Sequence, residues 1–152
     1  MEQERLPIVQ KMILAKSTEE RQAALDQLLP FQQSDFRGIF ESMIDEKGEG
    51  YPVVVRLIDP PLHEFLPSYE ELLVDVTRLE TQGGHEKELA EKREMLEAVG
   101  SMREMNPMLG LRGCRLGLLF PEINVMQTRA ILQAAVELER EGKLLHPKIM
   151  IP

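Results

Sequence analysis

The sequence predicts an α/β fold with parallel strands. One observation is a continuous apolar run from Val53 to Ile58, rich in β-branched residues and lacking polar alternation, which is typical of a strand buried on both faces of a parallel sheet. A second apolar run, Lys148–Pro152, predicts another buried strand. Between and before these runs, apolar residues recur at helical spacing. Helices that alternate with strands indicate parallel pairing.

The segment before the first strand is expected to be helical. Residues 4–16 carry apolar side chains at helical spacing, with a proline tolerable in the first turn. Ser17-Thr-Glu-Glu20 is a capping-box pattern that predicts the start of a second helix. Pro30 predicts a break, after which a third helix runs to about Ile44 and packs aromatic rings. The glycines of Lys47-Gly-Glu-Gly50 then predict a turn into the strand.

Two charged residues mark the end of that strand. Arg56 lies inside the apolar run, and a buried guanidinium costs several kcal/mol, as an order of magnitude, unless it is paired or meets an anion. Asp59 ends the run, and Pro60 and Pro61 stop the strand because neither donates to a ladder. The carboxyl ends of strands are where α/β sheets place ligands. Arg56 is therefore a candidate clamp for a phosphate or carboxylate; the alternative is a structural pair with Asp59, which we expect to orient it.

Residues 69–104 predict a charged helical excursion. Ser68-Tyr-Glu-Glu71 is a second capping box, and Gln82-Gly-Gly84 interrupts the helical pattern before a second charged helix, Glu86 to Arg103. This stretch holds ten acidic and five basic side chains, so it carries −5 of the formal net charge of −8. Such a helix pair is usually a solvated surface element, and a specific acidic docking surface is the alternative.

Residues 105–120 form a second stretch with chemical potential, expected to be a loop or short strand. Arg112 and Arg115 stand among three glycines, which allow close approach of backbone and ligand. Cys114 lies between the two arginines. Pro121 then predicts the start of a helix that Gly142 ends.

Composition excludes several classes of function. The 152-residue chain is 43% hydrophobic and 29% charged, as in a globular protein, and its net charge of −8 disfavours nucleic acid or an anionic membrane as a partner. No apolar run reaches the roughly 20 residues of a membrane span. A single cysteine favours a reducing compartment, so we expect a cytoplasmic location. His63-Glu64 is not a zinc motif because position 67 is proline, and no metal ligands are predicted.

Two motifs resemble the pyruvate, phosphate dikinase family of phosphoenolpyruvate (PEP)-utilising enzymes. They are Arg56-Leu-Ile-Asp-Pro-Pro-Leu-His-Glu-Phe-Leu-Pro67 and Asn106-Pro-Met-Leu-Gly-Leu-Arg-Gly-Cys-Arg-Leu-Gly117. The resemblance covers nearly the whole chain. It implies that residues 1–152 are part of the C-terminal PEP-binding domain, an incomplete (β/α)8 TIM-barrel segment from after the first strand to the fourth, with residues 69–104 inserted.

The resemblance also implies roles for residues. In the family, the arginine that Arg56 matches contacts the phosphoryl group of PEP, and Arg112 resembles a second phosphate-binding position. Arg115 is the weaker candidate and Asp59 the orienting carboxylate. Leu111 departs from the family, which commonly has histidine there. The family uses Mg²⁺, a catalytic cysteine, ATP and phosphate, and a phosphohistidine domain beside a nucleotide-binding domain; the resemblance places the Mg²⁺ ligands and that cysteine outside these 152 residues. It therefore implies that Cys114 is a small buried residue.

Three alternatives for function remain open. The first is the pyruvate/PEP half-reaction of a dikinase, the second a fragment of PEP synthase or phosphotransferase enzyme I, and the third a non-catalytic helical interaction module. For the first we expect the 152 residues to be inactive alone. Two unpaired strand edges in a partial barrel further predict either self-association, as a homo-oligomer, or a rearranged packing of the helices.

Overall fold

The computed structural model describes residues 4–102 and 108–152. The chain divides into two compact units. One unit combines residues 1–60 with residues 111–152, and the other spans residues 61–110. Each unit is described by itself.

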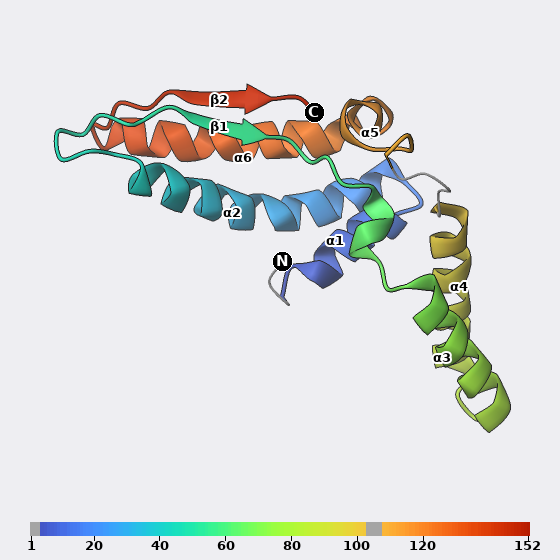
Figure 1. Ribbon diagram of the computed structural model, residues 1–152. Helices are drawn as coiled ribbons and strands as arrows, with labels where there is room; N and C mark the ends of the chain where they lie inside the picture. Colours follow the sequence, from blue (N-terminus) through green and yellow to red (C-terminus); the bar gives the residue numbers. More distant parts are fainter. Residues whose placement is uncertain (1–3, 103–107) are drawn as a thin grey trace. The chain divides into compact units, whose positions relative to one another are not determined.

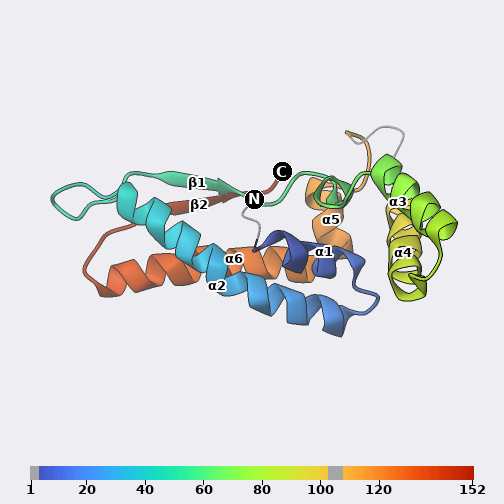
Figure 2. The same cartoon turned by 90° about the horizontal axis from the view of Figure 1, so that it is seen from below.

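The first unit is a two-stranded parallel sheet lying on helices (Figures 1 and 2). In chain order it contains α1 (Leu6–Leu14), α2 (Thr18–Ser42), β1 (Val53–Arg56), α5 (Gly113–Leu119), α6 (Pro121–Arg140) and β2 (Pro147–Met150). The strands pair in parallel, with Val53 opposite Pro147 and Arg56 opposite Met150. The predicted α/β class with parallel strands is therefore confirmed, as a helix-rich α/β unit.

The core of this unit lies between the sheet and helices α2 and α6. The apolar stripe of α6 supplies most of it, because Ile131, Ala134 and Leu138 fall on one helical face. Phe40 from α2 joins them at 1% exposure, and the ring of Phe36 stacks on it with centroids 6.4 Å apart. The predicted aromatic packing in the third helical segment is confirmed.

In the described residues helices cover one face of the sheet, so the prediction of strands buried on both faces is wrong. Val53 and Val55 pack against the core, whereas Val54 on the opposite face is 54% exposed. In β2, Ile149 and Met150 are 37% and 49% exposed. The apolar run was correctly assigned to a strand, but helices α2 and α6 lie against a single side of it (Figure 1).

Two local predictions also fail. Pro30 does not break the helix, because α2 continues through it from its Ser17 cap to Ser42. Helix α2 packs along α6, and Arg37 of α2 contacts Glu137 of α6 and Glu141, the residue that follows that helix; such tertiary packing outweighs the unfavourable helix propensity of proline. Residues 113–119 form helix α5 rather than a loop or strand. Residues 105–107 of that stretch lie outside the described residues.

The second unit contains two packed helices. It comprises the 3-10 turn η1 (Leu62–Phe65), α3 (Tyr69–Gln82) and α4 (Glu86–Met102). Ser68 Oγ accepts a hydrogen bond from the Glu71 amide at 3.1 Å, which confirms the helix start that the second capping-box pattern predicts at Ser68. Gly83 and Gly84 adopt positive φ between the helices, as the pattern predicts. Arg103 and Glu104, the end of the predicted excursion, lie outside the described residues.

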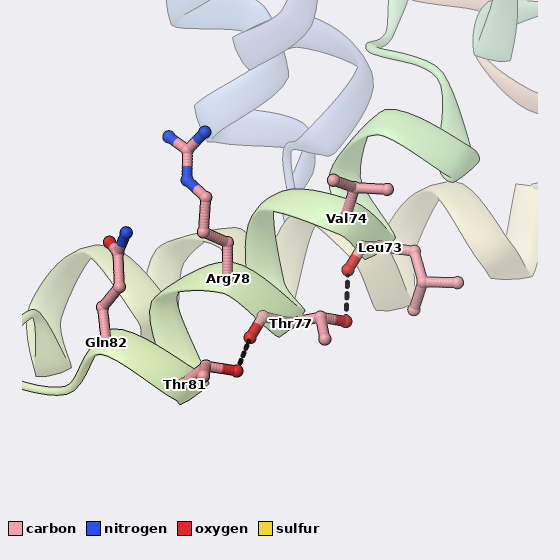
Figure 3. A pocket seen from close by; sticks show the side chains of 6 residues that line it. All are labelled: Leu73, Val74, Thr77, Arg78, Thr81 and Gln82. Atoms are coloured by element: carbon pink, nitrogen blue, oxygen red, sulfur yellow. Dashed lines mark hydrogen bonds between the residues drawn. The ribbon is translucent and has the colours of Figure 1, made fainter.

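The exposed side of α3 carries a shallow, mostly apolar hollow (Figure 3). Leu73, Val74 and Arg78 line it together with two threonines. The hydroxyls of Thr77 and Thr81 donate to carbonyls one turn earlier in the same helix, at 2.7 and 2.8 Å, so these side chains are satisfied within α3. Among the described helices of both units, none is long and apolar enough to cross a membrane.

Candidate functional site

The end of β1 presents the first two predicted site residues. Arg56 is the last residue of the strand, and its side chain is 57% exposed, on the sheet face that carries no helices. The expectation of a guanidinium surrounded by buried residues is therefore wrong. Asp59 follows three residues later and is mostly shielded, with 16% of its side chain exposed. The end of the strand thus places the exposed guanidinium of Arg56 beside the mostly buried carboxylate of Asp59.

The start of α5 brings the third residue. Arg112 immediately precedes the helix in extended conformation, and its side chain is 25% exposed. Its Nη2 donates to Asp59 Oδ2 at 2.5 Å and its Nε to Oδ1 at 3.3 Å. This two-point geometry is the characteristic pairing of a guanidinium with a carboxylate.

Asp59 is shared between two arginines. Besides the contacts from Arg112, Nη1 of Arg56 lies 3.4 Å from Asp59 Oδ2. The hydrogen bond from Arg112, aided by the charges of Arg112 and Arg56, lowers the pKa of the Asp59 carboxyl although partial burial opposes this. We call Arg56, Asp59 and Arg112 the arginine–aspartate cluster; with two cations and one anion, its charge is positive. The predicted pairing of Asp59 with Arg56 is present, but Arg112 is the closer partner.

Glycine at position 113 makes this arrangement possible. Gly113 has a φ of +55°, which residues with a side chain rarely adopt. A Cβ there would lie 3.0 Å from Asp59 Oδ1 and 3.3 Å from the carbonyl oxygen of Pro152. The next amide, that of Cys114, donates to the same Pro152 carbonyl at 3.1 Å. The backbone after Arg112 therefore packs directly on Asp59 and on the chain beyond β2.

A residue not predicted from the sequence supports the cluster from α6. Gln127 Oε1 accepts a hydrogen bond from the amide of Ile58 at 3.0 Å, immediately before Asp59. Its position beside the apolar stripe of α6 gives no distinctive pattern.

Two other residues of the second motif, Arg115 and Cys114, are exposed. Arg115 lies exposed on α5, three residues after Arg112, and the arginine charges that act on the Asp59 carboxyl are those of Arg112 and Arg56. Cys114 is a free, exposed cysteine, so the prediction of a small buried residue is wrong. It belongs to the first turn of a short helix whose buried positions are Gly113 and Leu116, which explains its outward position.

The described residues do not fit a magnesium ion. Mg²⁺ prefers several oxygen ligands in octahedral geometry, and Asp59 is the carboxylate of the cluster. Both of its oxygens already accept hydrogen bonds from Arg112. Residues 4–102 and 108–152 contain no group of three or more His, Cys, Asp or Glu side chains placed to hold a metal.

Comparison with known proteins defines the class. The family model described as PEP-utilising enzyme, PEP-binding domain, matches residues 1–152. The chain therefore belongs to the PEP-binding domain family of PEP-utilising enzymes. This confirms the family that the two motifs indicated.

The similar proteins are pyruvate, phosphate dikinases. The chloroplastic enzymes of Mesembryanthemum crystallinum and Flaveria pringlei are each 50% identical over 150 residues, which is 98% of this chain and 14% of the relative. The pyruvate, phosphate dikinase of Entamoeba histolytica is 50% identical over 149 residues, covering 98% of this chain and 16% of the relative. The chain thus spans about one-seventh of the length of the curated relatives it matches.

These relatives contradict the predicted cytoplasmic location. The proteins from M. crystallinum and F. pringlei, and a further one from Flaveria trinervia, are named chloroplastic, whereas the E. histolytica protein carries no such word. The prediction relied on a single cysteine and on the lack of apolar spans. Those features indicate a reducing environment, but they do not distinguish one such compartment from another.

Proposed function

We propose that the arginine–aspartate cluster binds the phosphoryl group of PEP within a pyruvate, phosphate dikinase. The observation that carries the proposal is the meeting of Arg56 and Arg112 on one carboxylate at the carboxyl end of a parallel strand. Parallel α/β architectures place their ligands at this end of the strands. The names of the similar proteins support the dikinase over PEP synthase or phosphotransferase enzyme I.

The geometry favours an anionic ligand held by Arg56. More than half of the Arg56 side chain is exposed, and its contact with Asp59, at 3.4 Å, is an ion pair longer than an ordinary hydrogen bond. Guanidinium groups present several N–H donors in a planar fork that matches phosphate and carboxylate oxygens. Asp59 holds Arg112 side-on and fixes its orientation, while the excess positive charge of the cluster attracts the dianionic phosphoryl group.

The parent reaction follows from the proposed family role. The P–N bond of a phosphohistidine on another domain breaks, and a P–O bond forms to the enolate oxygen of pyruvate, giving PEP. A nucleotide-binding domain recharges the histidine from ATP and phosphate. Arg56 and Arg112 stabilise negative charge on the transferred group, because phosphoryl transfer depends mainly on positioning and electrostatics. Mg²⁺ belongs to the parent enzyme in this proposal, with ligands outside these residues.

The proposed context is a TIM barrel. We propose that residues 1–152 are one segment of a (β/α)8 barrel in which residues 69–104 form a helical excursion. Because the chain spans about one-seventh of its relatives, we also propose that it binds PEP or pyruvate without catalysing the reaction. In the described part of the chain β1 and β2 form a two-stranded sheet, so each has an edge without a strand partner there. Such edges favour self-association, and light scattering that shows a stable monomer would contradict this last point.

Calorimetric titration of PEP into the 152-residue chain tests the function. Arg56→Ala and Arg112→Ala are expected to weaken binding at least tenfold each, since each removes a charge-assisted contact of about 1.5–3 kcal/mol. Arg140→Ala is the matched control, because Arg140 is an exposed arginine in the last turn of α6. It should bind like the parent chain.

Equal binding by all four proteins would overturn the assignment of the cluster. Binding lost to the same extent in the Arg140→Ala control would show that overall charge, rather than this site, attracts the ligand. Inorganic phosphate titrated in parallel separates recognition of the phosphoryl group from recognition of the enol carboxylate. A non-catalytic helical module would bind neither ligand.

A further inference from the structure

Gln127 occupies an unusual position for a polar side chain. It lies on α6 next to the buried Met126, on the side of the helix that faces the end of β1. Its carbonyl oxygen accepts the Ile58 amide at 3.0 Å in a partly buried contact. A polar side chain in a partly buried position is unfavourable unless it is hydrogen-bonded.

The hydrogen bond between Ile58 and Gln127 lies where the pairing of β1 with β2 ends. The amide of Leu57 still donates to the carbonyl of Met150 in β2 at 3.0 Å. Consecutive amides of a strand point to opposite edges, so the amide of Ile58 points away from β2, and Gln127 of α6 accepts its hydrogen bond. The Ile58 amide is therefore satisfied by a side chain rather than by a neighbouring strand. Asp59 is the first residue after this anchor.

We infer that Gln127 is a positioning residue. By holding the Ile58–Asp59 backbone, it fixes Asp59 where its carboxylate contacts both Arg56 and Arg112. Asp59 contacts guanidinium groups from two separate segments, so a small shift of its backbone would disturb both contacts. The absence of a side chain at Gly113 leaves room for this carboxylate, because a Cβ there would lie 3.0 Å from Asp59 Oδ1. Gln127 therefore positions the backbone before Asp59, and Gly113 accommodates its carboxylate. Only the ligand-binding part of this inference rests on the proposed function.

The test compares substitutions at two glutamines of the same helix. Gln127→Leu removes the acceptor and retains similar volume. Gln127→Glu keeps an acceptor oxygen on a side chain of the same length. Gln127→Asn keeps the polar amide but shortens the side chain by one methylene group. Gln133→Leu is the matched control, because Gln133 is an exposed residue two turns further along α6. Amide hydrogen exchange at Ile58 and carbon NMR titration of the Asp59 carboxyl are the readouts.

Gln127→Leu and Gln127→Asn are expected to speed exchange of the Ile58 amide about fivefold, the effect of one lost hydrogen bond. The pKa of Asp59 should rise toward its ordinary value in both variants as the pairing with Arg112 loosens. Gln127→Glu should retain slow exchange at Ile58, and Gln133→Leu should leave both readouts unchanged. If Gln127→Leu does not fold, Gln127→Asn tests the same contact.

Unchanged exchange at Ile58 and an unchanged pKa of Asp59 in Gln127→Asn would overturn the inference. Fast exchange in Gln127→Glu as well would show that any change at this position perturbs the strand, which also overturns it. PEP titration into the same variants should show binding weakened about three- to tenfold in Gln127→Leu relative to Gln133→Leu. Failure of every protein to bind PEP, with the two NMR readouts responding as expected, would refute the proposed function and leave the positioning role intact.

Discussion

Arg112 and Asp59, 53 residues apart in the sequence, are joined by a two-point ionic hydrogen bond in which Arg112 Nη2 lies 2.5 Å from Asp59 Oδ2. The bond connects the start of α5 to the end of β1. Both segments belong to the same compact unit. The pairing therefore contributes to the stability of that unit and to the geometry of the proposed site, and the two contributions can be measured separately.

Ionisation of Asp59 should make the free energy of unfolding depend on pH in the acid range. Its pKa is lowered in the folded state, so the pairing stabilises the fold above the unfolded pKa of about 3.9 and is lost as pH falls through the lower folded value. Urea unfolding should show Asp59→Asn less stable than the parent chain at pH 7. The difference should shrink below about pH 4.

Asp75 provides a comparison in the other unit. A hydrogen bond from Lys92 at 2.8 Å lowers the pKa of the Asp75 carboxyl, so Asp75→Asn should show the same sign of pH dependence. It should leave the side-chain NMR signals of Arg112 unchanged, whereas Asp59→Asn should shift them. A stability difference for Asp59→Asn that is as large at pH 3 as at pH 7 would contradict the ionic origin of the effect.

Gly113→Ala should destabilise the first unit through two causes. The positive φ of +55° costs a residue with a side chain about 1–2 kcal/mol, and the new Cβ presses on Asp59 and Pro152. Gly142→Ala isolates the first cause, because Gly142 has a φ of +84° but nothing within 4 Å of its virtual Cβ. Urea unfolding should therefore show the larger loss at Gly113. Equal losses at the two positions would mean that the backbone near Asp59 relaxes without strain.

Pro30→Ala should stabilise the protein. Pro30 is exposed within α2, where it lacks the amide that would bond to the preceding turn. Alanine restores that bond and has a far better helix propensity; after allowing for the greater freedom of the unfolded chain, the gain should be about 1–3 kcal/mol in thermal unfolding. Pro121→Ala is the control, because a proline at the first position of α6 sacrifices no helical bond. A gain of equal size there would show that the helix interior is not the cause.

Local sequence patterns predicted most helices and strands. The errors arose where tertiary contacts determine the structure. The capping patterns at Ser17 and Ser68 specify hydrogen bonds within four residues, and both are present at 3.1 Å. Pro30 was misjudged because the packing of α2 on α6 supplies energy that a local rule omits. The exposed face of β1 could not be predicted either, since an apolar run does not reveal how many layers cover it.

In the candidate site, too, local sequence patterns identify some residues, whereas the roles of others depend on tertiary contacts. Arg56 and Asp59 could be identified because charges stand out in an apolar run. The motif resemblance added Arg112, but the closeness of Arg112 to Asp59 depends on the path of the chain between them. Gln127 gave no pattern of its own, because its role is visible only when α6 lies against the end of β1.

Arg21→Lys should destabilise the junction that leads from α5 into α6. The Arg21 guanidinium lies over the ring of Phe120 at 4.2 Å, donates to Glu122 at 3.0 Å and donates to the carbonyl of Ala15 at 3.1 Å. Its side chain is 12% exposed, so these contacts are largely shielded from water. Lysine keeps the charge but cannot stack and bond in two directions at once, and a loss of about 1–2 kcal/mol is expected in urea unfolding.

The matched control for that substitution is Arg37→Lys. Arg37 also joins α2 to α6, through Glu137 and Glu141, but its side chain is 31% exposed and its partners are more exposed still. A lysine can replace most of such a solvent-exposed contact, so little change in stability is expected. If the two lysine variants unfold at the same urea concentration, the enclosed position of Arg21 contributes nothing beyond its charge. If only Arg21→Lys loses stability, the stacked guanidinium holds Phe120, the residue that separates α5 from α6, and thereby helps to place the helix that follows Arg112.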